Sequence, residues 1–176
     1  SRFGSVPPAA LASVASRVGA DVSLFLEGGT VMMSGVGEHV EEVPPATGFA
    51  LGIVIPGFGL RTAEVYARWD DLEGPEGETV PDGSLPPSLR AGMPMRNDLL
   101  PAAIDLEHRL GDFMADVRVV WGSAVCLTGS GSACFGYFAT VDEAADAVAA
   151  VSHLIGEGRG VALRDHGVAE RVQRTG

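Results

Sequence analysis

The spacing of apolar residues in the first third of the chain predicts one helix followed by three strands. Leu11, Val14 and Val18 recur at helical spacing and precede a glycine that would end the helix. Stretches rich in β-branched and aromatic residues, bounded by Gly and Pro, indicate strands. The expected elements are a helix over residues 9–18 and strands over residues 30–34, 39–43 and 49–55.

The remainder of the chain predicts helices, a hairpin and a last strand. Thr62 would cap a helix that follows a glycine loop, and Thr140 with Glu143 three residues later matches a capping box. Residues 73–87, rich in Gly, Pro and acids, predict an exposed loop. The expected elements are helices over residues 63–72, 98–110, 111–121 and 141–155, and strands over residues 124–127, 133–138 and 159–164.

This order of elements indicates the fold class. After Pro44 the predicted order is β, α, α, β, β, α, β, with a domain boundary before residues 49–55. Such an order fits an α+β split sandwich in which helices cover one face of the sheet.

Composition and charge exclude several classes of protein. The chain has 176 residues with 46% hydrophobic content, which is too apolar for a disordered chain. With 23 Asp and Glu against 12 Lys and Arg, its net charge is -11, and it lacks the basic surface that nucleic acids and anionic membranes attract. All its cations are arginine, so a Walker lysine and a Schiff-base lysine are excluded within this chain.

The sequence predicts neither a metal site nor a membrane span. Cys126 and Cys134 lie in one apolar stretch and are expected to be reduced, buried thiols. The four histidines lack metal-ligand spacing, so no metal site is predicted. No apolar run reaches the roughly 20 residues that span a bilayer. We expect a soluble, cytoplasmic protein.

Three short features are candidates for chemistry or for ordinary local structure. The small residues of TGSGS, residues 128–132, would let backbone amides cradle a phosphate, but a plain tight hairpin has the same pattern. Asp21 precedes an apolar stretch and could be a helix cap or a catalytic base. Asn97 or Asp98 would be an ordinary helix cap.

Five motifs follow one another along nearly the whole chain. They are GADV at residues 19–22, GVGE at 35–38, TAEVY at 62–66, NDL at 97–99 and LTGSGSACF at 127–135. In this order they resemble the 4-diphosphocytidyl-2-C-methyl-D-erythritol kinase family, in the GHMP kinase superfamily of galactokinase, homoserine kinase, mevalonate kinase and phosphomevalonate kinase. Any single motif would be weak, whereas five in order are specific.

The resemblance implies a reaction and a set of site residues. The reaction is ATP-dependent phosphorylation of the 2-hydroxyl of 4-diphosphocytidyl-2-C-methyl-D-erythritol, a step of non-mevalonate isoprenoid biosynthesis. Mg²⁺ would arrive with ATP, as hard cations usually do at phosphates. The implied residues are Asp21 as catalytic base, Thr62 and Tyr66 at the substrate wall with Tyr66 stacked on the cytosine, and Gly129, Ser130 and Gly131 of the third glycine motif at the phosphates.

The resemblance also divides the chain. Residues 1–46 would be the tail of the N-terminal kinase domain, and residues 47–176 a ferredoxin-like C-terminal domain. The family's ATP-binding glycine loop and the lysine beside its catalytic aspartate have no counterpart here, so we expect the chain alone to be an incomplete, inactive fragment. Its expected partners are the cytidyl substrate and ATP, with no nucleic acid or membrane, and it would be a monomer or homodimer.

Two other functions fit parts of the sequence. A stand-alone α+β module that binds a small molecule without chemistry would explain the missing lysine and ATP loop. Another GHMP kinase, of the homoserine or mevalonate type, would share the glycine motif. The TAEVY and GADV segments favour the cytidyl enzyme over another GHMP kinase, and Asp21, Tyr66 and TGSGS in the family's order argue against the module.

Overall fold

The computed structural model describes residues 7–19, 22, 26, 30–35, 39–44, 46–90, 95–155 and 159–164. These residues form two compact units that meet in sequence at the Thr47–Gly48 bond. The assignment of residues 1–46 and 47–176 to two kinase domains stays a prediction. None of the described helices is both long and apolar enough to cross a bilayer.

The described residues of the first unit include a helix and a hairpin. Helix α1 (Pro8–Val18) has proline in its first turn and ends at Gly19, whose amide donates to the carbonyl oxygen of Ala15 at 3.1 Å. Strands β1 (Val31–Ser34) and β2 (His39–Glu42) pair antiparallel. The helix and both strands predicted from the sequence are confirmed. Asp21 lies outside the described residues.

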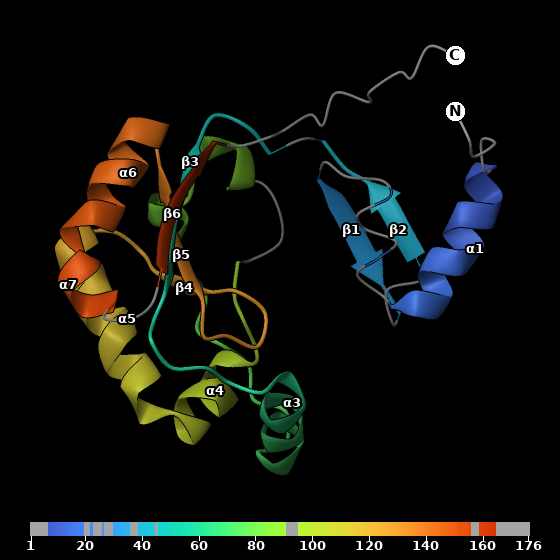
Figure 1. Cartoon of the computed structure of the whole chain (residues 1–176), viewed down its shortest axis with the longest axis horizontal. Coiled ribbons are helices and arrows are strands. Elements are labelled where there is room, and N and C mark those ends of the chain that lie inside the picture. Colours follow the sequence, from blue (N-terminus) through green and yellow to red (C-terminus); the bar gives the residue numbers. More distant parts are fainter. Residues whose placement is uncertain are drawn as a thin grey trace. The chain divides into compact units, whose positions relative to one another are not determined.

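The second unit is built on a four-stranded sheet (Figure 1). Its spatial order is β4-β5-β3-β6, and each neighbouring pair is antiparallel. The pairing of β4 with β5 confirms the predicted hairpin. The strands are β3 (Ala50–Ile55), β4 (Cys126–Leu127), β5 (Cys134–Phe138) and β6 (Arg159–Arg164).

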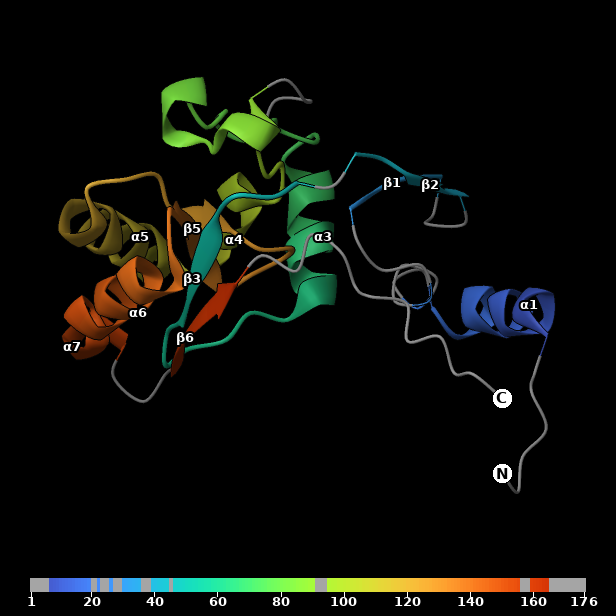
Figure 2. The same cartoon turned by 90° about the horizontal axis from the view of Figure 1, so that it is seen from above.

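Three helices cover one face of this sheet: α5 (His108–Trp121), α6 (Val141–Ala150) and α7 (Ser152–Ile155) (Figures 1 and 2). Strand β3 alternates as expected for a half-covered sheet, with Ala50 and Val54 almost fully buried. Between them, a Cβ on Gly52 would lie 2.8 Å from the ring of Phe138 and 3.3 Å from Val148 of α6. Glycine therefore lets α6 approach the sheet closely.

Helices α3 (Thr62–Asp71) and α4 (Leu100–Leu106) complete the second unit. The single helix expected over residues 98–110 is wrong, because Glu107 leaves helical geometry (φ -139°, ψ 88°) between α4 and α5. Its carboxylate instead accepts from the amide of Arg109 at 3.2 Å and caps α5. Helix α5 ends at Gly122 with a φ of 63°, a left-handed conformation that suits glycine.

The capping box before α6 is confirmed. The amide of Glu143 donates to Thr140 Oγ1 at 3.1 Å, and the Glu143 carboxylate accepts from the amide of Ala139 at 3.1 Å. The helix is shorter than predicted, because Val151 leaves helical geometry (φ -99°, ψ 8°) where its side chain is fully buried. The last turn before β6 is the separate helix α7.

The prediction of an exposed loop over residues 73–87 is wrong in part. Gly77 is buried, and Leu85 is 3% exposed between two 3-10 helices, η1 (Asp82–Ser84) and η2 (Pro87–Leu89). The amide of Val80 donates to the carbonyl oxygen of Met95 at 2.8 Å. The loop is thus anchored through its backbone, which a pattern of apolar side chains does not reveal.

Candidate active site

The glycine turn, Thr128–Ser132, joins β4 to β5. The amide of Thr128 donates to the carbonyl oxygen of Ala133, and the amide of Gly131 donates to that of Thr128, both at 3.0 Å. Gly129 and Gly131 have φ values of 55° and 86°, which other residues rarely adopt. Within the described part of the chain, no hydrogen bond uses the amides of Gly129 and Ser130. Consecutive unpaired amides of this kind can bind a phosphate.

Side chains tie the glycine turn to two other segments. Asn97 donates through Nδ2 to the carbonyl oxygens of Leu127 at 2.9 Å and Gly129 at 2.8 Å. Ser132 Oγ donates at 2.6 Å to the carbonyl oxygen of Phe58, in the loop that precedes α3. Ser132 is 6% exposed, so this bond is shielded from water. The turn is held from both sides.

Helix α3 meets the glycine turn at its first residue. Thr62 Oγ1 and Ser130 Oγ lie 2.9 Å apart and share a hydrogen bond. The prediction that Thr62 caps α3 is wrong: the helix already includes Thr62, Arg61 is the N-cap residue, and no side chain caps the helix. The Thr62 hydroxyl is instead directed to the turn.

Tyr66 lies one helical turn after Thr62 and is 53% exposed. The helix that bears it is fixed, because Val65 is fully buried and Arg68 Nε donates to Asp105 Oδ2 of α4 at 2.6 Å. This ion pair lowers the pKa of Asp105, mainly through the hydrogen bond from Arg68. A half-exposed aromatic ring on a fixed helix can stack on a planar ligand.

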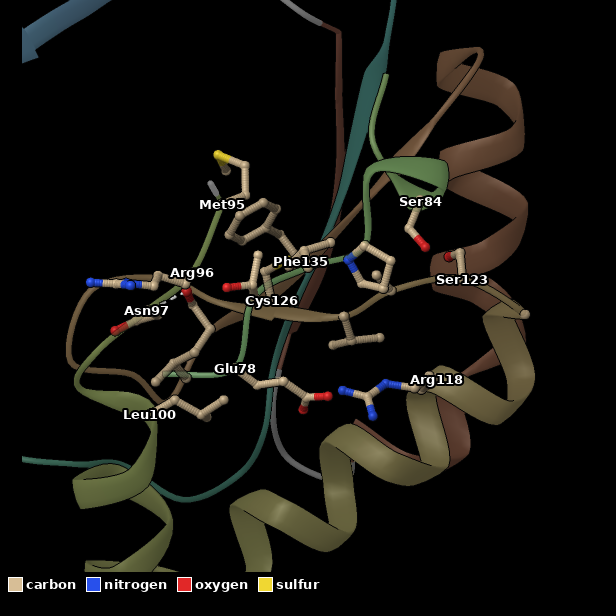
Figure 3. A pocket seen from close by; sticks show the side chains of 17 residues that line it. Glu78, Ser84, Met95, Arg96, Asn97, Leu100, Arg118, Ser123, Cys126 and Phe135 are labelled. Carbon is tan, nitrogen blue, oxygen red and sulfur yellow. Dashed lines mark hydrogen bonds between the residues drawn. The ribbon is translucent and has the colours of Figure 1, made fainter. Parts of the chain in front are cut away.

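A pocket of about 380 Å³ is lined by strand β4, by Asn97 and by residues of the neighbouring segments (Figure 3). Of the lining residues, Asn97 is bonded to the glycine turn and Leu127 directly precedes it. The side chains of Glu78 and Arg118 point toward one another across the pocket. Cys126 lines the pocket too, and burial raises the pKa of its thiol. The other lining residues are Thr79, Val80, Pro81, Ser84, Met95, Arg96, Leu100, Gly122, Ser123, Ala124, Val125 and Phe135.

The segment that bears Asn97 is itself anchored by the loop before it. Asp98 Oδ1 accepts from the amide of Gly77 at 2.9 Å and forms an ion pair with Arg96, whose Nε lies 2.9 Å away. A Cβ on Gly77 would lie only 2.0 Å from the carbonyl oxygen of Asn97, so the two backbones touch. The prediction that Asn97 or Asp98 caps a helix is wrong, because Leu99 is the N-cap of α4 and no side chain caps it.

The structure thus brings Thr62, Ser130 and the two glycines of the turn together, with Tyr66 one turn along α3. Asp21 cannot be placed among them, since it lies outside the described residues. In the described ranges, no three His, Cys, Asp or Glu side chains are placed to hold a metal ion. Sequence reasoning missed Asn97 as the clamp of the turn. The signal that could have pointed to it was the NDL motif at residues 97–99.

Comparison with known proteins finds relatives among kinases. No protein-family model matches the chain. A 4-diphosphocytidyl-2-C-methyl-D-erythritol kinase of Rhizobium leguminosarum is 35% identical over 148 residues, which are 84% of this chain and 50% of the relative. The same kinase of Paramagnetospirillum magneticum is 36% identical over 158 residues, covering 86% of this chain and 53% of the relative.

A solved structure agrees. The crystal structure of a 4-(cytidine 5'-diphospho)-2C-methyl-D-erythritol kinase superposes with a TM-score of 0.66 at 29% identity, over 87% of this chain and 56% of that one. The chain is homologous to these kinases. The resemblance drawn from the five motifs is therefore confirmed, as is a fold of mixed helix and sheet like that of the kinase. The chain spans about half the length of the curated kinases that it matches.

Proposed function

We propose that this chain serves a kinase that transfers the γ-phosphoryl group of ATP to the 2-hydroxyl of 4-diphosphocytidyl-2-C-methyl-D-erythritol. The observation that supports this most directly is the hydrogen bond between Thr62 and Ser130. It joins the helix with the exposed Tyr66 to the turn whose Gly129 and Ser130 amides have no partner among the described residues. The ring of Tyr66 can stack on a base, and the amides of the glycine turn can bind a phosphate. Together they suit a substrate that carries a nucleotide and a phosphoryl donor.

Each residue has a defined role in this proposal. Tyr66 stacks on the cytosine of the substrate, and Thr62 forms part of the same wall. The amides of Gly129 and Ser130 donate to phosphate oxygens, and Gly131 gives the turn the backbone conformation that exposes them. Asp21 accepts the proton of the 2-hydroxyl as that oxygen bonds to the γ-phosphorus and the bond to the departing ADP breaks.

ATP is the co-substrate in this proposal, and Mg²⁺ arrives bound to it. The unpaired amides of the glycine turn fit a phosphate, the part of ATP that such a turn can contact. Mg²⁺ usually keeps several waters and is held by phosphates together with one or two carboxylates. When bound, it neutralises charge on the transferred group.

We also propose that residues 47–176 are a ferredoxin-like split sandwich, as in the C-terminal domain of GHMP kinases. The antiparallel order β4-β5-β3-β6, with helices between β3 and β4 and between β5 and β6, supports this assignment. Residues 1–46 are then the tail of the N-terminal domain. A cytoplasmic location, and a monomer or homodimer, stay predictions.

The proposal is tested with the protein expressed from the gene that encodes this sequence. We expect ADP release that depends on 4-diphosphocytidyl-2-C-methyl-D-erythritol, and a new phosphate monoester in the ³¹P spectrum of the product. The 176-residue chain is assayed in parallel and is expected to show negligible transfer, because it contains no lysine. Phosphorylation of homoserine or mevalonate instead would assign another GHMP kinase, and binding without transfer by the gene product would support a non-catalytic module.

Variants of Tyr66 test the substrate wall. Stacking of a base on an aromatic ring contributes about 1–3 kcal/mol, so Tyr66→Ala should raise the KM for the cytidyl substrate by roughly 5- to 150-fold. Tyr66→Phe keeps the ring and should stay within about threefold of the wild type. Val119→Ala on α5, where Val119 is 82% exposed, is the control for truncating an exposed side chain. Equal KM values for the cytidyl substrate in all three variants would show that Tyr66 does not contact this substrate.

A further inference from the structure

Asn97 is the only asparagine in the chain, and all of its side-chain hydrogen-bonding contacts serve the glycine turn or its own local geometry. We propose that Asn97 is a positioning residue that orients the peptide of Gly129 and Ser130 so that its amide faces the phosphates of ATP. The inference rests on the proposed function for its chemistry. It rests on three hydrogen bonds for its geometry.

The first step of the argument concerns the two bonds that Asn97 donates. Its Nδ2 contacts the carbonyl oxygens of Leu127 at 2.9 Å and Gly129 at 2.8 Å, one before the turn and one within it. In a trans peptide the C=O and the N–H of the next residue point in opposite directions. Holding the Gly129 carbonyl oxygen toward Asn97 therefore points the amide of Ser130 away from Asn97.

The bond to Leu127 acts in the same way on the peptide that joins Leu127 to Thr128. With the Leu127 carbonyl oxygen directed to Asn97, the amide of Thr128 points to the opposite side, where it donates to Ala133 at 3.0 Å. One side chain thus sets two peptide planes. The peptide of Leu127 and Thr128 closes the hairpin. The peptide of Gly129 and Ser130 leaves the Ser130 amide without a partner among the described residues.

The second step concerns the orientation of the amide group of Asn97. Its Oδ1 accepts from the amide of Leu99 at 3.0 Å, which leaves Nδ2 facing the turn. Both donor hydrogens of Nδ2 are then used. Aspartate has almost the same shape and keeps the Leu99 bond, but it would place a carboxylate oxygen against two carbonyl oxygens. The turn therefore requires the amide group and not merely a polar side chain of this size.

The third step concerns what holds Asn97 in place. Its own carbonyl oxygen accepts from the amide of Leu100 at 3.1 Å, and the backbone of Gly77 packs against it from the other side. Asp98 anchors the same segment to Gly77. Because its backbone is fixed independently of the turn, Asn97 can impose a geometry on the turn rather than adapt to it.

Asn97→Asp is the variant that separates orientation from bulk, with Asn97→Ala as the truncation. In the protein expressed from the gene, we expect Asn97→Asp to raise the KM for ATP about tenfold or more, as for the loss of two hydrogen bonds. The KM for the cytidyl substrate should change less than about threefold, since Tyr66 lies on α3. Loss of folded protein alone would leave both KM values unchanged.

The control is Ser123→Ala. Ser123 and Asn97 both line the pocket of Figure 3. The buried hydroxyl of Ser123 has no hydrogen-bond partner among the described residues, so this variant should keep the wild-type KM for ATP. If Asn97→Asp is folded and also keeps that KM, the proposal is overturned. A wild-type protein without kinase activity would overturn the proposed function instead.

A measurement on the wild-type 176-residue chain decides the geometry without any activity or variant. The chain has one Asn and one Gln, so the side-chain amide signals of Asn97 are readily assigned in a ¹H–¹⁵N spectrum. We expect both Nδ2 hydrogens to exchange slowly with solvent, because each is used in a hydrogen bond. Fast exchange at Nδ2 would refute the positioning role even if the variants failed to fold.

Discussion

Gly77→Ala should destabilise the second unit far more than an ordinary loop substitution. A Cβ at residue 77 would lie 2.0 Å from the carbonyl oxygen of Asn97, 2.6 Å from its carbonyl carbon and 3.2 Å from its nitrogen. All three are backbone atoms, so no change of rotamer relieves the overlap. The segment of residues 76–78 or that of residues 96–98 has to move by more than an ångström.

The magnitude follows from three contributions. Overpacking of this kind costs about 1–3 kcal/mol. The displacement also weakens the hydrogen bond from the Gly77 amide to the Asp98 carboxylate, which contributes about 1.5 kcal/mol at a partly exposed site. Because alanine lowers the conformational entropy of the unfolded chain, the substitution offsets roughly 0.4–1 kcal/mol of this loss. The net loss is about 2–4 kcal/mol, a large part of a typical stability of about 5–15 kcal/mol.

Thermal unfolding followed by circular dichroism measures this loss. For a unit of this size, about 4 °C of Tm corresponds to 1 kcal/mol, so Gly77→Ala should lower Tm by roughly 8–16 °C. Gly83→Ala in η1 is the matched control, because no heavy atom lies within 4 Å of its added Cβ. Tm values for the two variants within about 3 °C of each other would show that the backbone contact at Asn97 does not constrain the loop.

Two further predictions concern pH and thiol chemistry. Because the bond from Arg68 lowers the pKa of Asp105 in the folded state, the ion pair stabilises the protein above the ordinary carboxyl pKa of 3.8 and ceases to do so as pH falls through the lower folded value. Asp105→Asn should therefore lower Tm at pH 7 but not at the acid limit of a Tm series, and a pH-independent difference would contradict this. Burial raises the pKa of the Cys134 thiol to about 12, so at pH 8 iodoacetamide should alkylate it about a thousandfold more slowly than in urea. Mass spectrometry distinguishes the two rates, and equal rates would contradict the burial of this thiol.

The sequence was sufficient to predict elements whose residues satisfy local rules. The capping box at Thr140 and Glu143 and the hairpin around the glycine turn were both predicted and confirmed. In each case the partner in the hydrogen bond or the strand pair lies nearby in sequence. The pattern and the contact therefore carry the same information.

Two of the errors came where a side chain has a distant partner. Thr62 was assigned to a local cap, but its hydroxyl bonds Ser130, 68 residues away. Asn97 was assigned to a cap as well, but its amide bonds Leu127 and Gly129 across 30 and 32 residues. Thr and Asn are favoured at helix caps, so propensity alone gives the local answer. Only the tertiary fold shows that these polar groups are used elsewhere.

The NDL segment shows why such residues form a short motif. Asn97 needs an amide group to hold the turn, Asp98 needs a carboxylate to accept from Gly77, and Leu99 packs against the core and donates its amide to Asn97. Each residue acts in a different direction, so no periodicity links them, and a change in one alters the position of the other two. The motif is therefore a joint between the loop of residues 73–87 and the glycine turn. If the turn binds phosphate as proposed, the requirement for all three residue types follows from that single joint.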